Sequence, residues 1–263
     1  MRLFWELSLV SLRRHLTYRT ATLAGLATNF FFGLLRAAIL IALYGARTEV
    51  ADITLQGAIT YAGLTQAMIG FLSLFSWYEL MKSVYSGEVG TDLLKPVDYF
   101  TFWMAQDSGR AIVNLGLRGL PLLALFALVY DLVYPASLLQ WLGVGIALLF
   151  AWGVSFSWRF VINLSAFWTP DARGIIGFFI ILSLFFSGFL MPLRFFPDWV
   201  QHLSTLTPFP LMLNTPVEIY LGVLRGPELI RALLTQLAWV VGLIFAGQLV
   251  LRVGIRRLVI QGG

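Results

Sequence analysis

The amino-acid sequence predicts an all-α integral membrane protein with six transmembrane helices, folded as a single domain over residues 1–263. Of its 263 residues, 59% are hydrophobic and only 12% are charged, and the mean hydropathy is +0.84. A soluble domain carries about 25% charged residues, so this chain cannot cover a water-facing surface. Six apolar segments are long enough to cross a hydrocarbon core of about 30 Å as helices: 20–44, 53–78, 111–130, 136–158, 174–193 and 230–251.

Residues 1–19 are expected to form an interfacial helix ahead of the first span. One face carries apolar residues at helical spacing, and Arg13 and Arg14 lie away from it. The apolar face consists of Trp5, Leu9, Leu12 and Leu16. Such a helix lies in the membrane plane with its arginines toward lipid headgroups. The alternative is that these residues simply extend the first span. The charges between residues 13 and 19 argue against that alternative.

Two arginines lie inside otherwise apolar spans. Arg36 in the first span and Arg118 in the third have no carboxylate partner within their own span. Charged residues inside a membrane are costly and are therefore candidates for a role in the transport path or in gating. The simpler interpretation is that each is satisfied structurally, at a helix–helix interface, by snorkelling or by backbone carbonyls.

A polar segment, 79–110, interrupts the apolar chain between the second and third spans. It contains Lys82 and Lys95, the only lysines, and the run SGEVGTDLLKP, which is punctuated by glycine and proline. Arginine and lysine are enriched in cytoplasmic loops. Placing both termini in the cytoplasm gives the cytoplasmic side an excess of these residues of roughly three to one, so we expect this segment in the cytoplasm as well.

Residues 87–98 are expected to form a short cytoplasmic helix parallel to the membrane. Two glycines interrupt the helix that leaves the second span, Thr91 is the expected N-cap of the short helix, and Pro96 disfavours its continuation. Leu93 and Leu94 then remain as apolar knobs suited to a groove on a partner. The alternative is a plain connecting loop. The aromatic residues that follow are expected to form an interfacial belt: Tyr99, Phe100, Phe102 and Trp103.

The segment 195–222, before the last span, is expected to hold two short external helices that dip into the outer leaflet. Pro197 can open the first, with Trp199 on its apolar side. Thr215 and Glu218 are the two ends of a capping box that can open the second. A rigid turn with prolines at Pro208 and Pro210 joins them. The alternative is an ordinary extracellular loop.

Missing motifs exclude several functions. The chain has no GxxxxGK[ST] phosphate loop, no HExxH and no GxSxG, so it is not expected to bind ATP phosphates or to be an enzyme itself. Without cysteine and with only two distant histidines, no metal site is expected. Asp107 and Asp171 are interpreted as local salt partners or helix caps. The net charge of +5 is attributed to membrane orientation and lipid headgroups rather than to nucleic acid.

Together these parts resemble an ABC-2 type permease, the membrane subunit of an ATP-binding-cassette exporter. The resemblance rests on the interfacial N-terminal helix, the SGEVGTDLLKPVDYF run, six helices, and the external segment MPLRFFPDWVQHLSTLTPFPLMLNTPVEIYLG. Its most specific pieces are LLKP at 93–96 and the FFPDWV…LTPFP pattern at 195–210. Unlike some relatives, the chain has no large extracellular domain.

The resemblance implies roles for each part. The N-terminal helix, with Trp5, Arg13 and Arg14, corresponds to an elbow helix, and 195–222 to a pair of re-entrant helices. The 87–98 segment corresponds to the coupling helix that docks on a nucleotide-binding subunit. Its implied contact residues are Gly87, Glu88, Asp92, Leu93, Leu94, Lys95 and Pro96. Such complexes contain two permease chains, identical or related, in the cell membrane, and two ATPase chains that bind ATP and Mg²⁺.

Three functions therefore remain open. The first is the permease subunit of an ATP-driven exporter of an amphipathic or hydrophobic substrate. The second is an autonomous secondary carrier or channel, which the lack of buried acidic residues disfavours and which would tolerate changes at residues 93–95. The third is a membrane-embedded enzyme, such as a lipid-modifying transferase, with its site between Asn163 and Arg173, whose activity would depend on Asp171.

Overall fold

The computed structural model describes residues 2–17, 19–75, 77–169 and 171–257. Within these residues the chain consists of helices, the loops that join them and one small antiparallel hairpin of β1 (Glu49–Val50) and β2 (Ile53–Thr54). The helices are α1 (Arg2–Thr17), α2 (Arg19–Tyr44), α3 (Leu55–Leu72), α4 (Glu79–Ser86), α5 (Glu88–Leu93), α6 (Tyr99–Asn114), η1 (Leu115–Gly119), α7 (Leu120–Val129), α8 (Leu138–Asn163), η2 (Leu164–Phe167), α9 (Arg173–Phe186), η3 (Leu193–Phe195), α10 (Asp198–Thr205), α11 (Asn214–Tyr220) and α12 (Pro227–Ile255).

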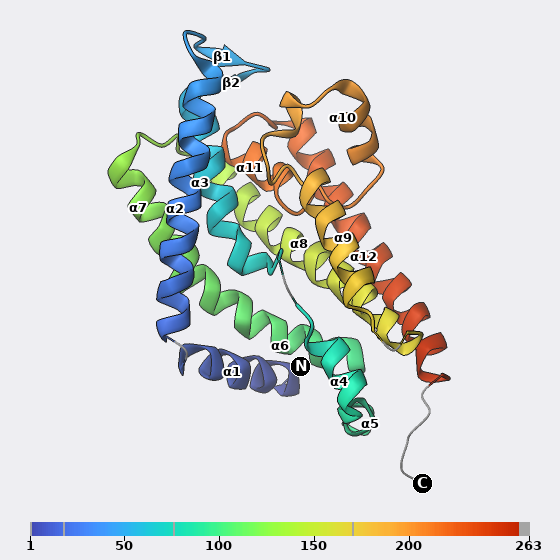
Figure 1. The fold of residues 1–263 in the computed structure, drawn as a ribbon. Coiled ribbons are helices and arrows are strands. Elements are labelled where there is room, and N and C mark those ends of the chain that lie inside the picture. The colour runs from blue at the N-terminus through green and yellow to red at the C-terminus, as the bar shows by residue number, and fades with distance from the viewer. Residues whose placement is uncertain (1, 18, 76, 170, 258–263) are drawn as a thin grey trace.

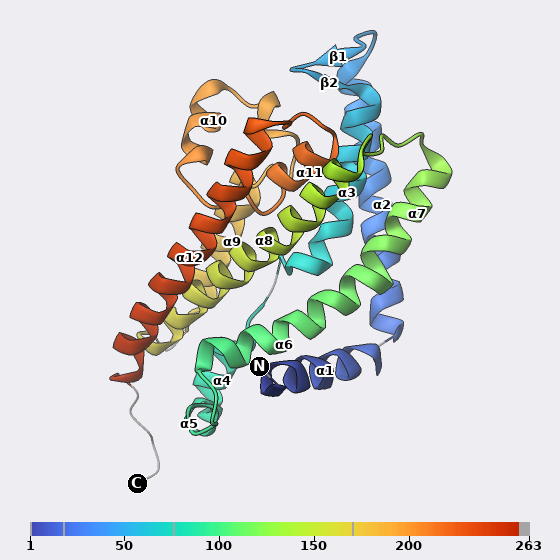
Figure 2. The same ribbon diagram turned by 180° about the vertical axis from the view of Figure 1, so that it is seen from behind.

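The long helices form a bundle with two distinct ends (Figure 1). The end that carries α1, α4 and α5 is called the lower end, and the end that carries the hairpin, α10 and α11 is called the upper end. Helices α8 and α12 pack along each other, and α2 packs on α3 (Figure 2). The middle of α3 is buried on almost every side, so this helix forms the centre of the bundle.

Four helical stretches of the described chain are long and apolar enough to cross a membrane: Thr22–Tyr44, Tyr99–Val129, Leu138–Phe167 and Pro227–Ile255. They coincide, to within two residues or by containing them, with the first, third, fourth and sixth predicted spans. The second and fifth correspond to α3, with 18 residues, and α9, with 14. A 14-residue helix is only about 21 Å long, which is shorter than the hydrocarbon core. The count of six spans therefore remains a prediction.

The helix that carries the third predicted span begins well before that span. The helix starts at Tyr99, not at residue 111, because the Asp98 carboxylate accepts a hydrogen bond from the Thr101 amide at 3.0 Å and caps the helix. It continues through π-helical η1 into α7. Pro121 is the second residue of α7, one position beyond the residue that follows η1. Proline lacks an amide donor and its ring displaces the carbonyl four residues earlier, which accounts for the irregular turn at this point.

The upper end holds two short helices, α10 and α11, within the predicted 195–222 segment. Helix α10 begins directly after Pro197, as predicted, and exposes Trp199. The capping box predicted for α11 is wrong. Thr215 lies inside the helix, and the Glu218 carboxylate instead accepts a hydrogen bond from Arg194 at 2.8 Å. This tertiary ion pair uses the carboxylate that a capping box would need. Whether α10 and α11 enter the membrane remains a prediction.

Candidate functional site

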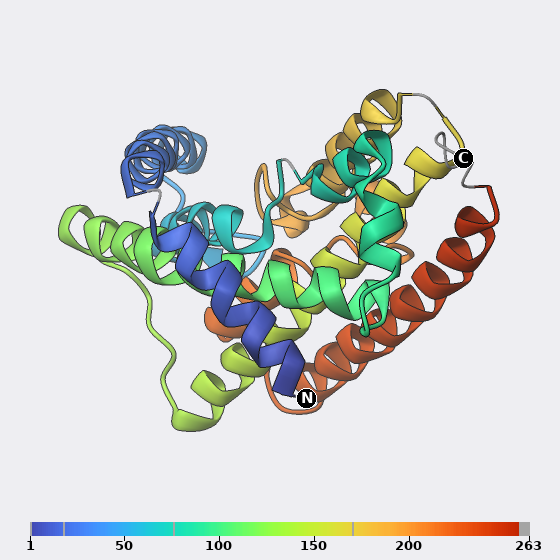
Figure 3. The ribbon, with the colours of Figure 1, turned by 90° about the horizontal axis from the view of Figure 1, so that it is seen from below.

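The lower end presents a compact pair of short helices, α4 and α5, beneath the bundle (Figures 1 and 3). Gly87 joins them with φ +79°, a left-handed conformation that glycine adopts without a steric penalty. The predicted N-cap at Thr91 is wrong, because α5 begins at Glu88 and includes both Gly90 and Thr91. Only one of the two glycines interrupts the helix, so the short helix starts four residues earlier than a Thr91 cap implies.

The two leucines predicted as knobs have different surroundings. Leu94 is 87% exposed at the end of α5, whereas Leu93 packs against the buried aromatic residues below α8. Lys95 is held within the chain, because its ammonium lies 2.6 Å from the Asp92 carboxylate and 3.8 Å from the centre of the Phe102 ring. Of the two leucines, Leu94 is therefore the one whose side chain is accessible on the surface formed by α4 and α5. The exposed residues of the predicted coupling set are Gly87, Glu88, Leu94 and Pro96.

An aromatic cluster attaches α4 and α5 to the bundle. The residues predicted to form an interfacial belt are buried in it instead. They lie on the first two turns of α6 and pack against other parts of the fold: Phe100 packs edge-on to Phe156 and Phe160 of α8, and Trp103 packs edge-on to Trp77. The buried belt residues are Tyr99, Phe100, Phe102 and Trp103. Val89 of α5 joins the same cluster, so a force on α5 acts directly on α6 and α8.

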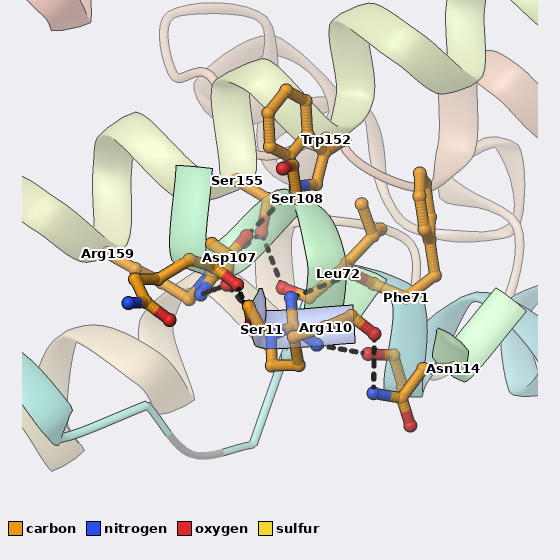
Figure 4. A network of polar contacts seen from close by, with 12 residues as sticks. Ser11, Phe71, Leu72, Asp107, Ser108, Arg110, Asn114, Trp152, Ser155 and Arg159 are labelled. Carbon is orange, nitrogen blue, oxygen red and sulfur yellow. Dashed lines mark hydrogen bonds and ion pairs between the residues drawn. The ribbon is translucent and has the colours of Figure 1, made fainter. Parts of the chain in front are cut away.

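A buried charge network lies above this cluster (Figure 4). Asp107 of α6 has a fully buried side chain. Its carboxylate accepts hydrogen bonds from Arg110 at 2.8 Å, from Arg159 of α8 at 3.0 and 3.1 Å, and from the Trp152 indole at 2.9 Å. The predicted local pair of Asp107 and Arg110 is confirmed. Since two guanidinium groups share one carboxylate, the network carries a net positive charge.

The end of α3 balances that extra charge. Arg110 donates to the carbonyl oxygens of Gly70 at 2.6 Å and Phe71 at 3.0 Å, and Ser155 donates to Leu72 at 2.8 Å. The last carbonyls of a helix lack partners within the helix, and the negative end of the helix dipole favours cations. Arg110 therefore joins the end of α3 to Asp107.

One face of α8 connects all these parts. Ser155, Arg159 and Asn163 recur every four residues and so lie on one side of the helix; we call them the α8 polar stripe. Asn163 donates to the Trp77 carbonyl at 3.0 Å and accepts from the Met81 amide at 3.3 Å. The α8 polar stripe thus holds the end of α3, the charge network and the start of α4 in one array.

Arg36 and Arg118 both lie at helix–helix contacts. Arg36 donates to the Thr65 hydroxyl at 3.0 Å and to the Leu190 carbonyl at 3.2 Å. Arg118 donates to Asn29 at 3.1 Å. No carboxylate pairs with either arginine in the part of the chain that the structure describes. These contacts favour the structural interpretation, and a role in gating stays a prediction.

Helix α1 crosses beneath α6 (Figure 3). The contact uses small polar residues: Ser11 donates to the Gln106 carbonyl at 2.6 Å, and Ser108 to the Ser8 hydroxyl at 2.8 Å. The helices approach so closely that a Cβ atom on Gly109 would lie 2.7 Å from the Leu12 amide nitrogen. The predicted elbow residues Trp5, Arg13 and Arg14 are exposed on the other faces of α1.

Replacing Gly109 with valine is expected to detach α1 from α6, because a side chain at this position would overlap the backbone of α1. The chain contains no cysteine, so a Ser8→Cys/Ser108→Cys pair can report the contact through oxidative cross-linking. We expect the cross-link to form in the parent chain and to be lost with Gly109→Val. Gly242→Val, where an added Cβ meets nothing within 4 Å, should keep it. Equal cross-linking in both variants would contradict the packing.

The long apolar helices of the fold fit a multi-pass, almost entirely helical membrane protein, and the array of polar contacts lies toward its lower end. Residues 30–262 match the family described as ABC-2 family transporter protein, and the chain belongs to that family. No curated protein was found to match the chain. Membership makes the protein a membrane permease of an ABC system and implies an ATP-binding partner.

Proposed function

We propose that this protein is the transmembrane permease subunit of an ATP-driven exporter for an amphipathic or hydrophobic substrate. The lower end and both termini face the cytoplasm. A separate nucleotide-binding subunit, which holds ATP and Mg²⁺, docks on this lower end. The observation that carries this proposal is Leu94, an 87% exposed leucine directly after α5 whose two neighbours in sequence, Leu93 and Lys95, are tied into the fold. An apolar knob of this kind suits a groove on a protein partner.

The α8 polar stripe offers a route for the transmitted movement. When nucleotide binding draws the partner subunits together, α4 and α5 move with them as a rigid body. Asn163 ties the start of α4 to α8, and Arg159 ties α8 to Asp107 of α6. The displacement therefore reaches α6, α8 and the end of α3 together. A second permease chain, identical or related, completes the path that opens.

The experiment that tests this function is purification from the native host in mild detergent. We expect a soluble ATPase in a one-to-one ratio with the permease, and ATP hydrolysis that depends on both proteins. Reconstituted transport should require ATP. A chain that purifies alone and transports without ATP would contradict the proposal and would support an autonomous secondary carrier or channel instead.

A further inference from the structure

An apolar cavity of about 360 Å³ lies between α3, α7, α8 and α11. This volume falls within the range of ligand-binding pockets. Its walls include Leu64 and Met68 of α3, Leu123 of α7, and Val144 and Leu148 of α8. None of these side chains carries a strong hydrogen-bonding group. These walls can therefore hold an apolar ligand, but they cannot orient a polar one.

The cavity opens toward the region that the membrane occupies. Helix α7 belongs to one candidate span and α8 to another. Their ends at the connecting loop lie apart (Figure 3), and the two spans come together only lower down, where Trp152 and Arg159 of α8 reach Asp107 of α6. Leu120, which lines the cavity, is itself exposed. An opening between two spanning helices faces lipid hydrocarbon rather than water. Small residues, Ala124 and Ala127, line its α7 side and leave room for a chain to pass.

Water is a poor occupant of this space. A buried water needs two to four polar partners. The Thr60 hydroxyl is the polar group of α3 at the cavity, and it already donates to the Gln56 carbonyl at 2.8 Å and accepts from the Val133 amide at 2.9 Å. An empty cavity is also unfavourable, because its lining loses dispersion contacts on one side.

The backbone next to the cavity is irregular. The π-helical segment η1 supplies Leu115 to the wall, and Leu120 follows it directly. Single π-helical turns inside α-helices are frequent at functional sites. At the upper rim of the cavity lie Tyr134 and Trp141, aromatic residues of the kind that sit at the depth of lipid headgroups.

We propose that this cavity binds one acyl chain of a bilayer lipid, which enters between α7 and α8. The apolar walls bind the alkyl chain, and Tyr134 and Trp141 lie beside its headgroup end. The site is separate from the docking surface around Leu94, and the proposal does not depend on an ATPase partner.

The test uses a phospholipid with a photoactivatable diazirine on its acyl chain, reconstituted with the full-length chain in nanodiscs. Met68 and Val144 are buried, with 4% and 7% of their surface exposed, so surrounding lipid cannot reach them. We expect labelling at these two positions after irradiation. Labelling confined to exposed residues would overturn the proposal.

Matched variants separate the cavity from the general lipid surface. Ala124→Phe and Ala127→Phe place a ring in the opening from exposed positions of α7, so they should fold normally and reduce labelling of Met68 and Val144 several-fold. Leu128→Phe, on the same helix at an 83% exposed position that does not line the cavity, should leave it unchanged. Equal labelling in all three variants would also overturn the proposal.

Discussion

Replacing Leu94 with aspartate is expected to abolish co-purification of the ATP-binding subunit while the permease remains folded. Leu94 is exposed, so the substitution removes no core packing. In the complex it would put an unpaired charge into an apolar groove, which is strongly unfavourable. Loss of an interface hot spot costs about 2 kcal/mol or more, or roughly a 30-fold loss of affinity. The measurement is the amount of ATPase retained on affinity-purified permease.

Leu206→Asp provides the matched control. Leu206 is a 73% exposed leucine that ends a short helix, α10, at the opposite end of the molecule. Because it has the same exposure pattern but no place in the proposed interface, its substitution should leave ATPase binding unchanged. Retention of the ATPase by Leu94→Asp, or equal loss with both variants, would show that the docking surface lies elsewhere.

Replacing Asp107 with alanine is expected to cause the largest loss of stability of any single substitution at the lower end. The change leaves Arg110 and Arg159 buried without a carboxylate. Breaking a buried ion pair by removing one partner costs about 3–5 kcal/mol. The measurement is the free energy of unfolding in detergent micelles. It should fall by about this amount, and the purified yield should fall with it.

Asp171→Ala is the control for that measurement. Asp171 is exposed and lies 3.9 Å from Arg173, another exposed side chain, and such surface pairs contribute about 0–1 kcal/mol. Its replacement should therefore leave the free energy of unfolding almost unchanged. If Asp107→Ala proved as stable as Asp171→Ala, the charge network could not be what holds α3, α6 and α8 together.

The sequence could predict contacts between residues that are close together in the chain, but not contacts between distant residues. The pair of Asp107 and Arg110 was predictable because the two residues lie three positions apart on one helix. Arg159 lies just beyond the predicted fourth span, 136–158, and nothing local indicates that it reaches a carboxylate 52 positions away. Its spacing from Ser155 and Asn163 is the one signal that could have identified the α8 polar stripe.

The helix boundaries show the same limit. The apolar segments predicted the four longest helical stretches of the described chain, and Pro197 correctly marked the start of α10. The caps at Thr91 and Thr215 were wrong because capping patterns describe only local hydrogen bonds, and both residues lie inside their helices. Similarly, Leu93 and Leu94 are equivalent in the sequence, and only the packing of Leu93 against the aromatic cluster distinguishes them.

Site-specific cross-linking from residue 94 tests the central claim most directly. The chain has no native cysteine, so Leu94→Cys can carry a photoreactive maleimide at a single position in the intact membrane, with Leu206→Cys as its control. The proposed docking predicts an adduct between position 94 and a soluble ATP-binding subunit, and none from position 206. An adduct from neither position, or equal adducts from both, would contradict it.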